Sequence, residues 1–139
     1  MDLGTLATLN TSNEGVWVQV ELYGKKQDFE LCILGEDSDK VYEYSKNKIK
    51  KLRKNVKGGE IDLDDEAMED IFESADEDVI IRLNGIRALD GSEVTLNGKT
   101  LKNDVKSYTM LVENIPAIKE FITKFSKERT NFLLKEKKN

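Results

Sequence analysis

In residues 16–22, VWVQVEL, an aliphatic side chain occupies every second position, and Trp17, Gln19 and Glu21 lie between them. This period of two places successive residues on opposite faces of a β-strand and predicts a strand with one buried face. After the connection YGKKQD the pattern returns at Phe29, Leu31 and Ile33. Two such runs joined by a short glycine-containing connection are typical of an antiparallel β-hairpin. On the first strand, the buried residues are expected to be Val16, Val18, Val20 and Leu22.

After Gly35 the pattern changes to that of a helix. Ser38 or Asp39 is a suitable N-cap, acidic residues lie near the start and lysines toward the end, and Gly58-Gly59 would end the helix. Its apolar positions form a thin stripe that we expect to pack against the hairpin. They are Val41, Tyr44, Ile49, Leu52 and Val56.

A second helix is predicted where the composition becomes acidic, between Glu60 and Asp78. Asp64 is its expected N-cap, and Leu63 and Met68 are placed as a hydrophobic staple. The run DVIIRL that follows is too short to show a decisive period, so it either continues the helix or forms a short strand. The buried face of the helix would consist of Ala67, Met68, Ile71, Phe72 and Ala75.

Residues 84–100 are expected to be irregular. The dipeptides Asn84-Gly85, Asp90-Gly91 and Asn97-Gly98 favour positive φ angles and turns. A short helix follows over residues 101–113. Its inward positions are expected to be Leu101, Val105, Tyr108, Leu111 and Val112.

The last helix is expected to begin at Pro116, because a missing N–H costs nothing at the first helical position. In residues 117–139 the apolar side chains recur at helical spacing and form one stripe. The members of the stripe are Ile118, Phe121, Ile122, Phe125, Phe132 and Leu133.

Together these patterns predict an α+β fold, in which an N-terminal antiparallel β-hairpin packs with a mainly helical C-terminal half of three to four helices. A chain of 139 residues is long enough for one domain with a core. We therefore expect a single domain, 1–139, with a lobe formed by the hairpin and the basic helix (1–57) and a helical lobe (60–139).

The composition excludes several kinds of site. There is no histidine and a single cysteine, Cys32, which removes the usual zinc ligand sets, the Ser-His-Asp and Cys-His arrangements and any disulfide within the monomer. Cys32 lies in the apolar run FELCILG and is interpreted as a buried small hydrophobe. The acidic run DLDDEAMED lacks the glycine of a calcium loop, and the glycines form no nucleotide-binding motif. We expect no cofactor, no metal and no catalytic residue.

A net charge of −5 disfavours nucleic acid as a general partner. A local basic run, KNKIKKLRKNVK, keeps a phosphate-binding face open as an alternative. Its basic residues are Lys46, Lys48, Lys50, Lys51, Arg53, Lys54 and Lys57. No apolar run approaches the length of a membrane span, and the N-terminus lacks the features of a signal peptide. We therefore expect a soluble, cytoplasmic protein without a membrane partner.

The second half of the chain combines several features in a fixed order. A short apolar run is followed by Asn84-Gly85, the loop at Asp90-Gly91, a helix, and a last helix from Pro116 that ends in the pair Asn131-Phe132. In this order, over roughly residues 66 to 135, the chain resembles the tail assembly chaperones of long-tailed (siphovirus-like) bacteriophages and prophages.

The resemblance implies a chaperone without enzymatic activity. Such proteins coat the long, largely helical tape measure protein in the host bacterial cytoplasm before the tail tube polymerises around it, and they are absent from the mature virion. The implied partners are the tape measure protein, the tail tube protein and further copies of the chain.

The implied partner-binding residues lie near the end of the last helix. Ile118, Phe121 and Phe125 are interpreted first as core, and Phe125 is also counted among the residues that contact a partner. The candidate partner-binding residues are Phe125, Asn131, Phe132 and Leu133.

Two alternatives to a chaperone stay open. A structural tail or head-tail connector subunit of the virion would share the size and the α+β character. A small nucleic-acid-binding regulator would act through the basic run.

Overall fold

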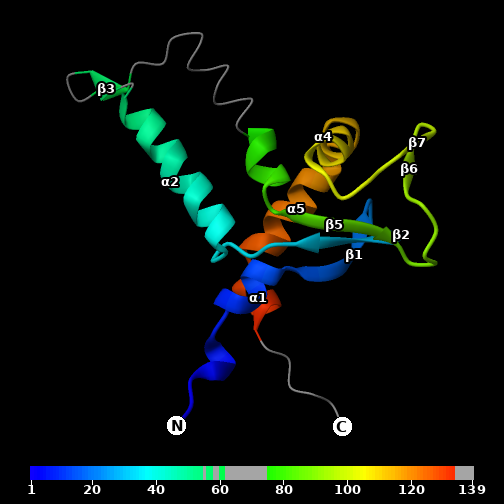
Figure 1. The fold of residues 1–139 in the computed structure, drawn as a ribbon, viewed down its shortest axis with the longest axis horizontal. Coiled ribbons are helices and arrows are strands. Elements are labelled where there is room, and N and C mark those ends of the chain that lie inside the picture. The colour runs from blue at the N-terminus through cyan, green and yellow to red at the C-terminus, as the bar shows by residue number, and fades with distance from the viewer. Residues whose placement is uncertain (55, 58–59, 62–74, 134–139) are drawn as a thin grey trace.

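The computed structural model describes residues 1–54, 56–57, 60–61 and 75–133 (Figure 1). Some predictions concern other parts of the chain. The glycines Gly58-Gly59, residues 62–74 of the expected acidic helix with its N-cap Asp64, and the lysine-rich end after Leu133 lie outside the described residues. Ala75, which was expected on the buried face of that helix, is helical but exposed, so this part of the prediction is wrong.

The predicted N-terminal hairpin is confirmed. Strands β1 (Val16–Leu22) and β2 (Lys25–Ile33) pair antiparallel, with a register shift between Gln19 and Glu21. The turn between them is shorter than expected, since only Tyr23 and Gly24 separate the strands. Both have positive φ angles, 56° and 75°, which match the twist of a tight two-residue hairpin turn.

A third strand extends this sheet. Strand β5 (Leu83–Ala88) pairs antiparallel with β2, so that the strand order is β1-β2-β5. The predicted turn at Asn84-Gly85 is therefore wrong, because both residues lie inside a strand. The sheet joins a strand from the second half of the chain to the N-terminal hairpin, and the α+β fold class is confirmed.

Gly85 serves close packing across the sheet. It stands in register with Cys32, which in turn pairs with Trp17 on β1, and the Trp17 indole lies over it on the outer face of the sheet. A Cβ atom at Gly85 would stand 2.5 Å from the Trp17 ring carbon Cη2. The Arg87 guanidinium, one position further along that face, lies 3.9 Å from the centre of the same ring, a favourable cation–π distance.

We expect Gly85→Ala to destabilise the protein by about 1–3 kcal/mol, because the added methyl group forces the indole ring to move. Trp17 is the only tryptophan, so its emission spectrum reports the displacement directly, and urea denaturation followed by circular dichroism measures the cost. In a Trp17→Leu background the same substitution should cost much less. An equal cost in both backgrounds would show that the indole does not occupy this position.

Residues 89–100 are more regular than expected. Asp90-Gly91 and Asn97-Gly98 form turns as predicted, with Gly91 at φ 79° and Asn97 and Gly98 at φ 50° and 82°. The second of these turns closes a small antiparallel hairpin, β6 (Thr95–Leu96) with β7 (Lys99–Thr100). A similar short pair, β3 (Val56–Lys57) with β4 (Glu60–Ile61), lies earlier in the chain.

The first helices lie before β1 and after β2 in the chain. A 3₁₀ turn, η1 (Gly4–Leu6), precedes α1 (Leu9–Glu14), and neither was predicted. Helix α2 (Asp39–Lys54) begins after Ser38, whose hydroxyl accepts a hydrogen bond from the Val41 amide at 3.3 Å, as expected of an N-cap.

Helix α2 does not lie along the hairpin. It leaves the body of the protein after its first turn (Figure 1). Val41 is buried at 1% exposure, but Ile49 is 51% exposed, so the prediction that the whole stripe packs on the hairpin is wrong. One and two turns beyond Val41 the same side of the helix carries Ser45 and Lys48, which are only partly buried. The lysine charge resists full burial, so this side does not continue the apolar contact. The helix also ends earlier than predicted, and Val56 of the expected stripe lies in the short strand β3 (Val56–Lys57).

The ambiguous run DVIIRL combines both predicted states. Residues 75–80 are helical, and Leu83 starts β5.

Helix α4 (Val105–Asn114) follows the β6–β7 hairpin, and the Asp104 carboxylate caps it by accepting a hydrogen bond from the Ser107 amide at 2.8 Å. Tyr108, Leu111 and Val112 are buried as predicted, whereas Val105 is 66% exposed. That prediction is wrong because the helix starts at residue 105, and its first residue turns away from the core.

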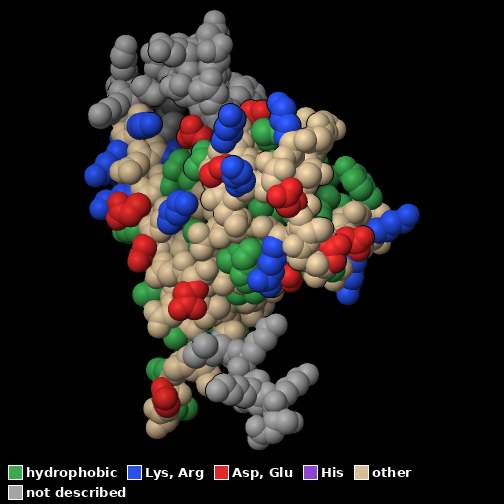
Figure 2. All heavy atoms as spheres, turned by 45° about the vertical axis from the view of Figure 1, so that its right-hand side comes forward, with side chains coloured by type: hydrophobic (Ala, Val, Ile, Leu, Met, Phe, Trp, Pro, Cys, Tyr) green, Lys and Arg blue, Asp and Glu red, His purple; other side chains and the backbone are tan. Residues whose placement is uncertain are grey.

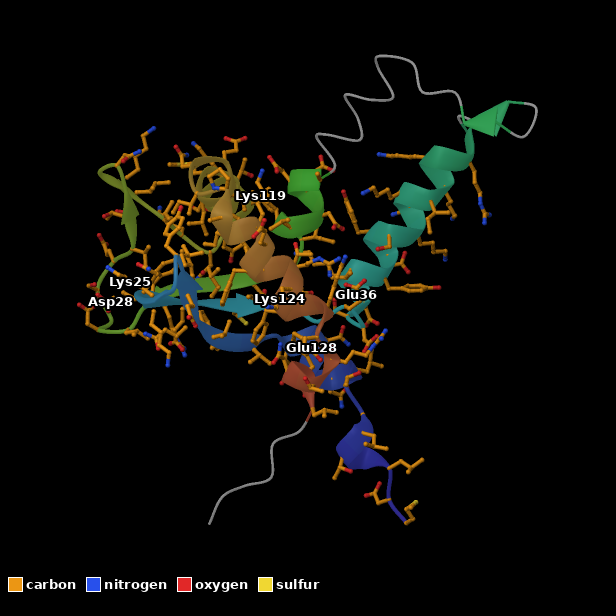
Figure 3. All side chains as sticks on the ribbon, turned by 180° about the vertical axis from the view of Figure 1, so that it is seen from behind. Lys25, Asp28, Glu36, Lys119, Lys124 and Glu128 are labelled. Carbon is orange, nitrogen blue, oxygen red and sulfur yellow. The ribbon has the colours of Figure 1, made fainter. Side chains whose placement is uncertain are left out.

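Helix α5 (Ala117–Lys127) crosses one face of the sheet (Figure 3). Pro116 immediately precedes it, in agreement with the predicted start. Its residues Ile118, Ile122 and Ser126 are fully buried, the two isoleucines in the apolar core. Ile118 and Ile122 pack in a core to which the sheet contributes Val20, Leu22, Leu31, Ile33, Leu83 and Ile86.

A buried arginine fixes α5 to the sheet. The Arg82 side chain is 2% exposed, and its Nη1 donates to Glu36 Oε2 at 2.6 Å and to Ser126 Oγ at 2.9 Å. Its Nη2 lies 3.5 Å from Asp78 Oδ1. The Ser126 hydroxyl donates onward to the Leu34 carbonyl at 2.7 Å. This network joins the end of β2, the segment before β5 and the end of α5.

Candidate functional site

The C-terminal end of α5 presents an aromatic pair beside the sheet. Phe121 and Phe125 are one helical turn apart, and their rings stack with centroids 6.4 Å apart. Both side chains pack on the core cluster while staying partly exposed. The pair therefore has one side that packs inward and one side that is open.

The chain turns back after α5. The helix ends at Lys127, Glu128 is extended, and the 3₁₀ turn η2 (Arg129–Phe132) follows. The Asn131 side chain donates to the Phe125 carbonyl at 3.1 Å, and the Glu128 amide donates to the same carbonyl at 3.3 Å, so both hold the turn against the helix end. The single helical stripe predicted through Phe132 is therefore wrong, because a turn and not a helix brings Phe132 to the aromatic pair.

An ion pair anchors this turn to the N-terminal segment. Arg129 donates from Nε and Nη2 to the Asp37 carboxylate at 3.0–3.1 Å, and the Thr8 hydroxyl donates to Asp37 Oδ2 at 2.7 Å. The hydrogen bonds from Arg129 and Thr8 hold the pKa of the Asp37 carboxyl below its usual range. The anchor keeps the end of α5 close to α1 and to the start of α2.

We expect Asp37→Asn to lower stability at neutral pH and to have no effect in strong acid. The folded state favours the Asp37 carboxylate. Its contribution is therefore present above the usual Asp pKa of about 4 and is lost as the pH falls through the lower folded pKa. Because the Arg129 side chain is 66% exposed, the difference at pH 7 should stay below about 1 kcal/mol.

Urea denaturation of wild type and Asp37→Asn between about pH 2 and pH 7 measures this difference. Asp28→Asn, which changes an exposed carboxyl on the hairpin, is the matched control and should show no such trend. A difference between wild type and Asp37→Asn that grows toward acid pH would contradict the assignment.

A groove of about 500 Å³ opens between the end of α5 and the hairpin turn. Its apolar surface comes from Phe121 and Phe125. Charged and polar groups surround these rings, with Lys124 and Glu128 lying toward the end of α5 (Figure 3). The complete lining is Glu21, Gly24, Phe121, Lys124, Phe125, Glu128 and Asn131.

The structure separates the four candidate partner-binding residues. Phe125 and Asn131 line the groove. Leu133, two residues after Asn131, does not line it and is partly exposed. Phe132 is only 1% exposed, and its ring makes an edge contact with Phe125 at 5.7 Å between centroids. In this conformation the Phe132 ring is part of the protein's own packing and offers no surface to a partner.

The groove also contains residues that the sequence did not single out as partner-binding. Phe121 could have been found, because it lies on the predicted stripe four residues before Phe125. Glu21 and Gly24 belong to the hairpin and reach the groove only because the sheet packs under α5. No local pattern in the sequence connects them with Lys124 and Glu128.

The structure also shows how Cys32 and the carboxylates of the described residues are placed. Cys32 is buried at 3% exposure, as predicted, and burial raises the pKa of its thiol. Within the described residues no three cysteine or carboxylate side chains are grouped so that they would hold a metal ion.

Comparisons of the chain with protein-family models, with curated proteins and with solved structures find no significant match. Among the helices of the described residues, none combines the length and apolar character that crossing a membrane requires.

Proposed function

We propose that the protein is a tail assembly chaperone of a long-tailed bacteriophage or prophage, which binds an apolar stripe of the helical tape measure protein before the tail tube polymerises. The observation that carries the proposal is the groove at the end of α5, where the open side of the Phe121–Phe125 pair is surrounded by charged side chains. The resemblance of residues 66–135 to such chaperones supports the same function.

The groove suits a helix better than a small polar ligand. Its apolar floor is two aromatic rings one helical turn apart, and apolar side chains on a partner helix repeat at the same interval. Charges of both signs, Lys124 with Glu21 and Glu128, stand around the floor and suit the polar flanks of an amphipathic helix. A volume of about 500 Å³ accepts a few side chains of the partner, not a whole helix.

A long partner would then be covered by many copies of the chain. Each copy shields a short length of the apolar stripe, and several weak contacts together give a high total affinity. Covering the stripe prevents the exposed apolar patches from causing aggregation. Weak individual contacts also allow the tube protein to displace the chaperone.

The proposal places the gene of a long, predominantly helical protein next to the gene of this chain, and the test is co-expression of the two proteins. We expect wild type to keep that protein soluble and to co-purify with it. Phe121→Ser should weaken the interaction by about tenfold or more, since an aromatic anchor typically contributes about 2 kcal/mol. Val105→Ser, which removes a 66% exposed apolar side chain on α4, is the matched control and should bind normally.

Three results would overturn the proposal. The first is the absence of such a partner gene. The second is equal binding by the Phe121→Ser and Val105→Ser variants while both are folded by circular dichroism. The third is the presence of the chain in purified virions by mass analysis, which would favour a structural tail or connector subunit.

A further inference from the structure

Helix α2 carries a second exposed surface, on the side that faces away from the protein. Tyr42 and Ile49 are 63% and 51% exposed and lie seven residues, or two helical turns, apart. Lys46, Lys50 and Arg53 are exposed at positions that fall on the same face, at spacings of four and seven residues. We call these five residues the outer stripe of α2.

The orientation of this stripe is fixed by the opposite side of the helix. Val41 is buried, and the Tyr44 hydroxyl lies 3.5 Å from Glu77 Oε2 on the helical segment before β5. Burial, together with the carboxylates of Glu77 and Asp78, raises the pKa of Tyr44 to about 12. Tyr44 therefore stays neutral in this contact, and the outer stripe must point to solvent.

The cations of the outer stripe are available to a partner. Within the described part of the chain, Lys46, Lys50 and Arg53 form no ion pair. Helix α2 projects from the body of the protein (Figure 1), and lysine and arginine side chains line the left edge of the molecule, where this helix lies (Figure 2). The protein as a whole is acidic, with a net charge of −5, so this basic surface is a local exception.

We propose that the outer stripe of α2 is a docking surface for an acidic amphipathic helix of a partner protein. The apolar pair Tyr42 and Ile49 would contact the apolar face of that helix, and Lys46, Lys50 and Arg53 would pair with the carboxylates beside it. Charge complementarity selects an acidic occupant, and the two large apolar side chains within the stripe select one that also offers apolar contacts.

Nucleic acid fits this surface less well. A long polyanion would be repelled by the net negative charge of the rest of the protein. Ile49 has no aromatic face on which a base could stack, yet it stands between Lys46 and Lys50 in the middle of the stripe. A single acidic helix needs only a few carboxylates at matching spacing.

The outer stripe is separate from the groove at the end of α5. None of its residues lines that groove, and its proposal does not depend on the chaperone function. Phe121→Ser should therefore leave binding at the outer stripe unchanged, whereas changes in the stripe should leave the groove intact.

The test uses a synthetic helical peptide of about 20 residues, or about 30 Å, with a leucine stripe flanked by glutamates. A second peptide carries lysine in place of every glutamate, and a short DNA duplex is the third probe. Fluorescence anisotropy at low and at moderate salt measures binding of each to the whole chain. We expect the acidic peptide to bind more tightly than the other two, with an affinity that falls as salt screens the charges.

The triple variant K46E/K50E/R53E should weaken binding of the acidic peptide at least tenfold, or about 1.4 kcal/mol. I49S should weaken it as well. The matched control is K99E/K102E/K106E, which reverses three exposed lysines near β7 and α4 and should bind like wild type.

Four outcomes would overturn the proposal. These are no binding of the acidic peptide, equal weakening by both triple variants, tighter binding of the DNA duplex, or tighter binding of the lysine peptide. If sedimentation shows that K46E/K50E/R53E instead dissociates an oligomer of the chain itself, the surface joins copies of this protein and the proposal also fails.

Discussion

Replacing Phe132 by alanine is expected to lower the free energy of unfolding by about 3–5 kcal/mol, the cost typical of removing a fully buried phenylalanine. The Phe132 ring is 1% exposed and packs edge-on against Phe125. It also lies against the loop between β2 and α2, since a Cβ atom at Gly35 would stand only 3.1 Å from Phe132 Cγ. Because these neighbours belong to the packed loop and helix end, we expect them to move little into the cavity that the ring would leave. Urea denaturation followed by circular dichroism measures the loss.

Leu133→Ala is the matched control for this prediction, since Leu133 is the next residue and stays partly exposed. It should cost well under half as much as Phe132→Ala. If Phe132→Ala costs less than about 1 kcal/mol, the ring is not packed inside the protein in solution. Phe132 would then be available to a partner, as the sequence alone had indicated.

Replacing Arg82 by alanine is expected to destabilise the protein by about 3 kcal/mol, at the lower end of the range for breaking a buried ion pair. The substitution removes the donor to Glu36 Oε2 and to Ser126 Oγ, and it leaves the nearby carboxylates without their cation. We place the value at the lower end because the Glu36 and Asp78 side chains are 34% and 28% exposed, and water can replace part of the interaction.

Thermal and urea denaturation of Arg82→Ala, Arg82→Lys and Arg87→Ala tests this prediction. Arg82→Lys keeps the charge but loses the planar fork that reaches several acceptors, so it should recover only part of the stability. Arg87 also forms an ion pair, with Glu30 at 2.9 Å, but its side chain is 52% exposed. Arg87→Ala removes this exposed ion pair and the cation–π contact with Trp17, and it should cost about 1–2 kcal/mol, less than Arg82→Ala. Equal losses for Arg82→Ala and Arg87→Ala would contradict the role given to the buried network.

The elements that the sequence predicted well have a strong local period. The hairpin strands carry aliphatic or aromatic residues at every second position, over Val16–Leu22 in the first and from Phe29 to Ile33 in the second, and they pair as expected. Helices α4 and α5 were found from their apolar spacing, and Pro116 marked the start of the second within one residue. In these segments the period of the strand or helix decides which face of the element each side chain occupies. The local sequence is therefore sufficient to predict the buried face.

The wrong predictions concern residue types that occur in more than one kind of environment. Asn84-Gly85 has the composition of a turn, but Gly85 is a glycine because the Trp17 ring needs the space above it. The apolar residues of α2 were expected to face the hairpin, yet Ile49 faces solvent. A short run of apolar residues in one helix does not show which distant part of the chain, if any, packs against it.

The candidate site shows the same division. Phe125 and Asn131 were predicted and lie at the groove, whereas Phe132 was predicted on a continuous helix and is buried through the turn η2. Glu21 and Gly24 complete the groove from the other end of the chain. The distance in sequence between these residues and α5 left no pattern from which their contact could be predicted.

By itself the sequence determined the β-hairpin and the part of the apolar stripe from Ile118 to Phe125 on α5, because strand and helix periods sort side chains onto faces without reference to the rest of the chain. Only the tertiary structure decided that β5 completes the sheet, that Arg82 is buried and that Phe132 turns inward while Phe121 and Phe125 stay half open. Those outcomes depend on pairing and packing between segments tens of residues apart. Many such pairings are compatible with one local pattern, and only the packed core selects among them.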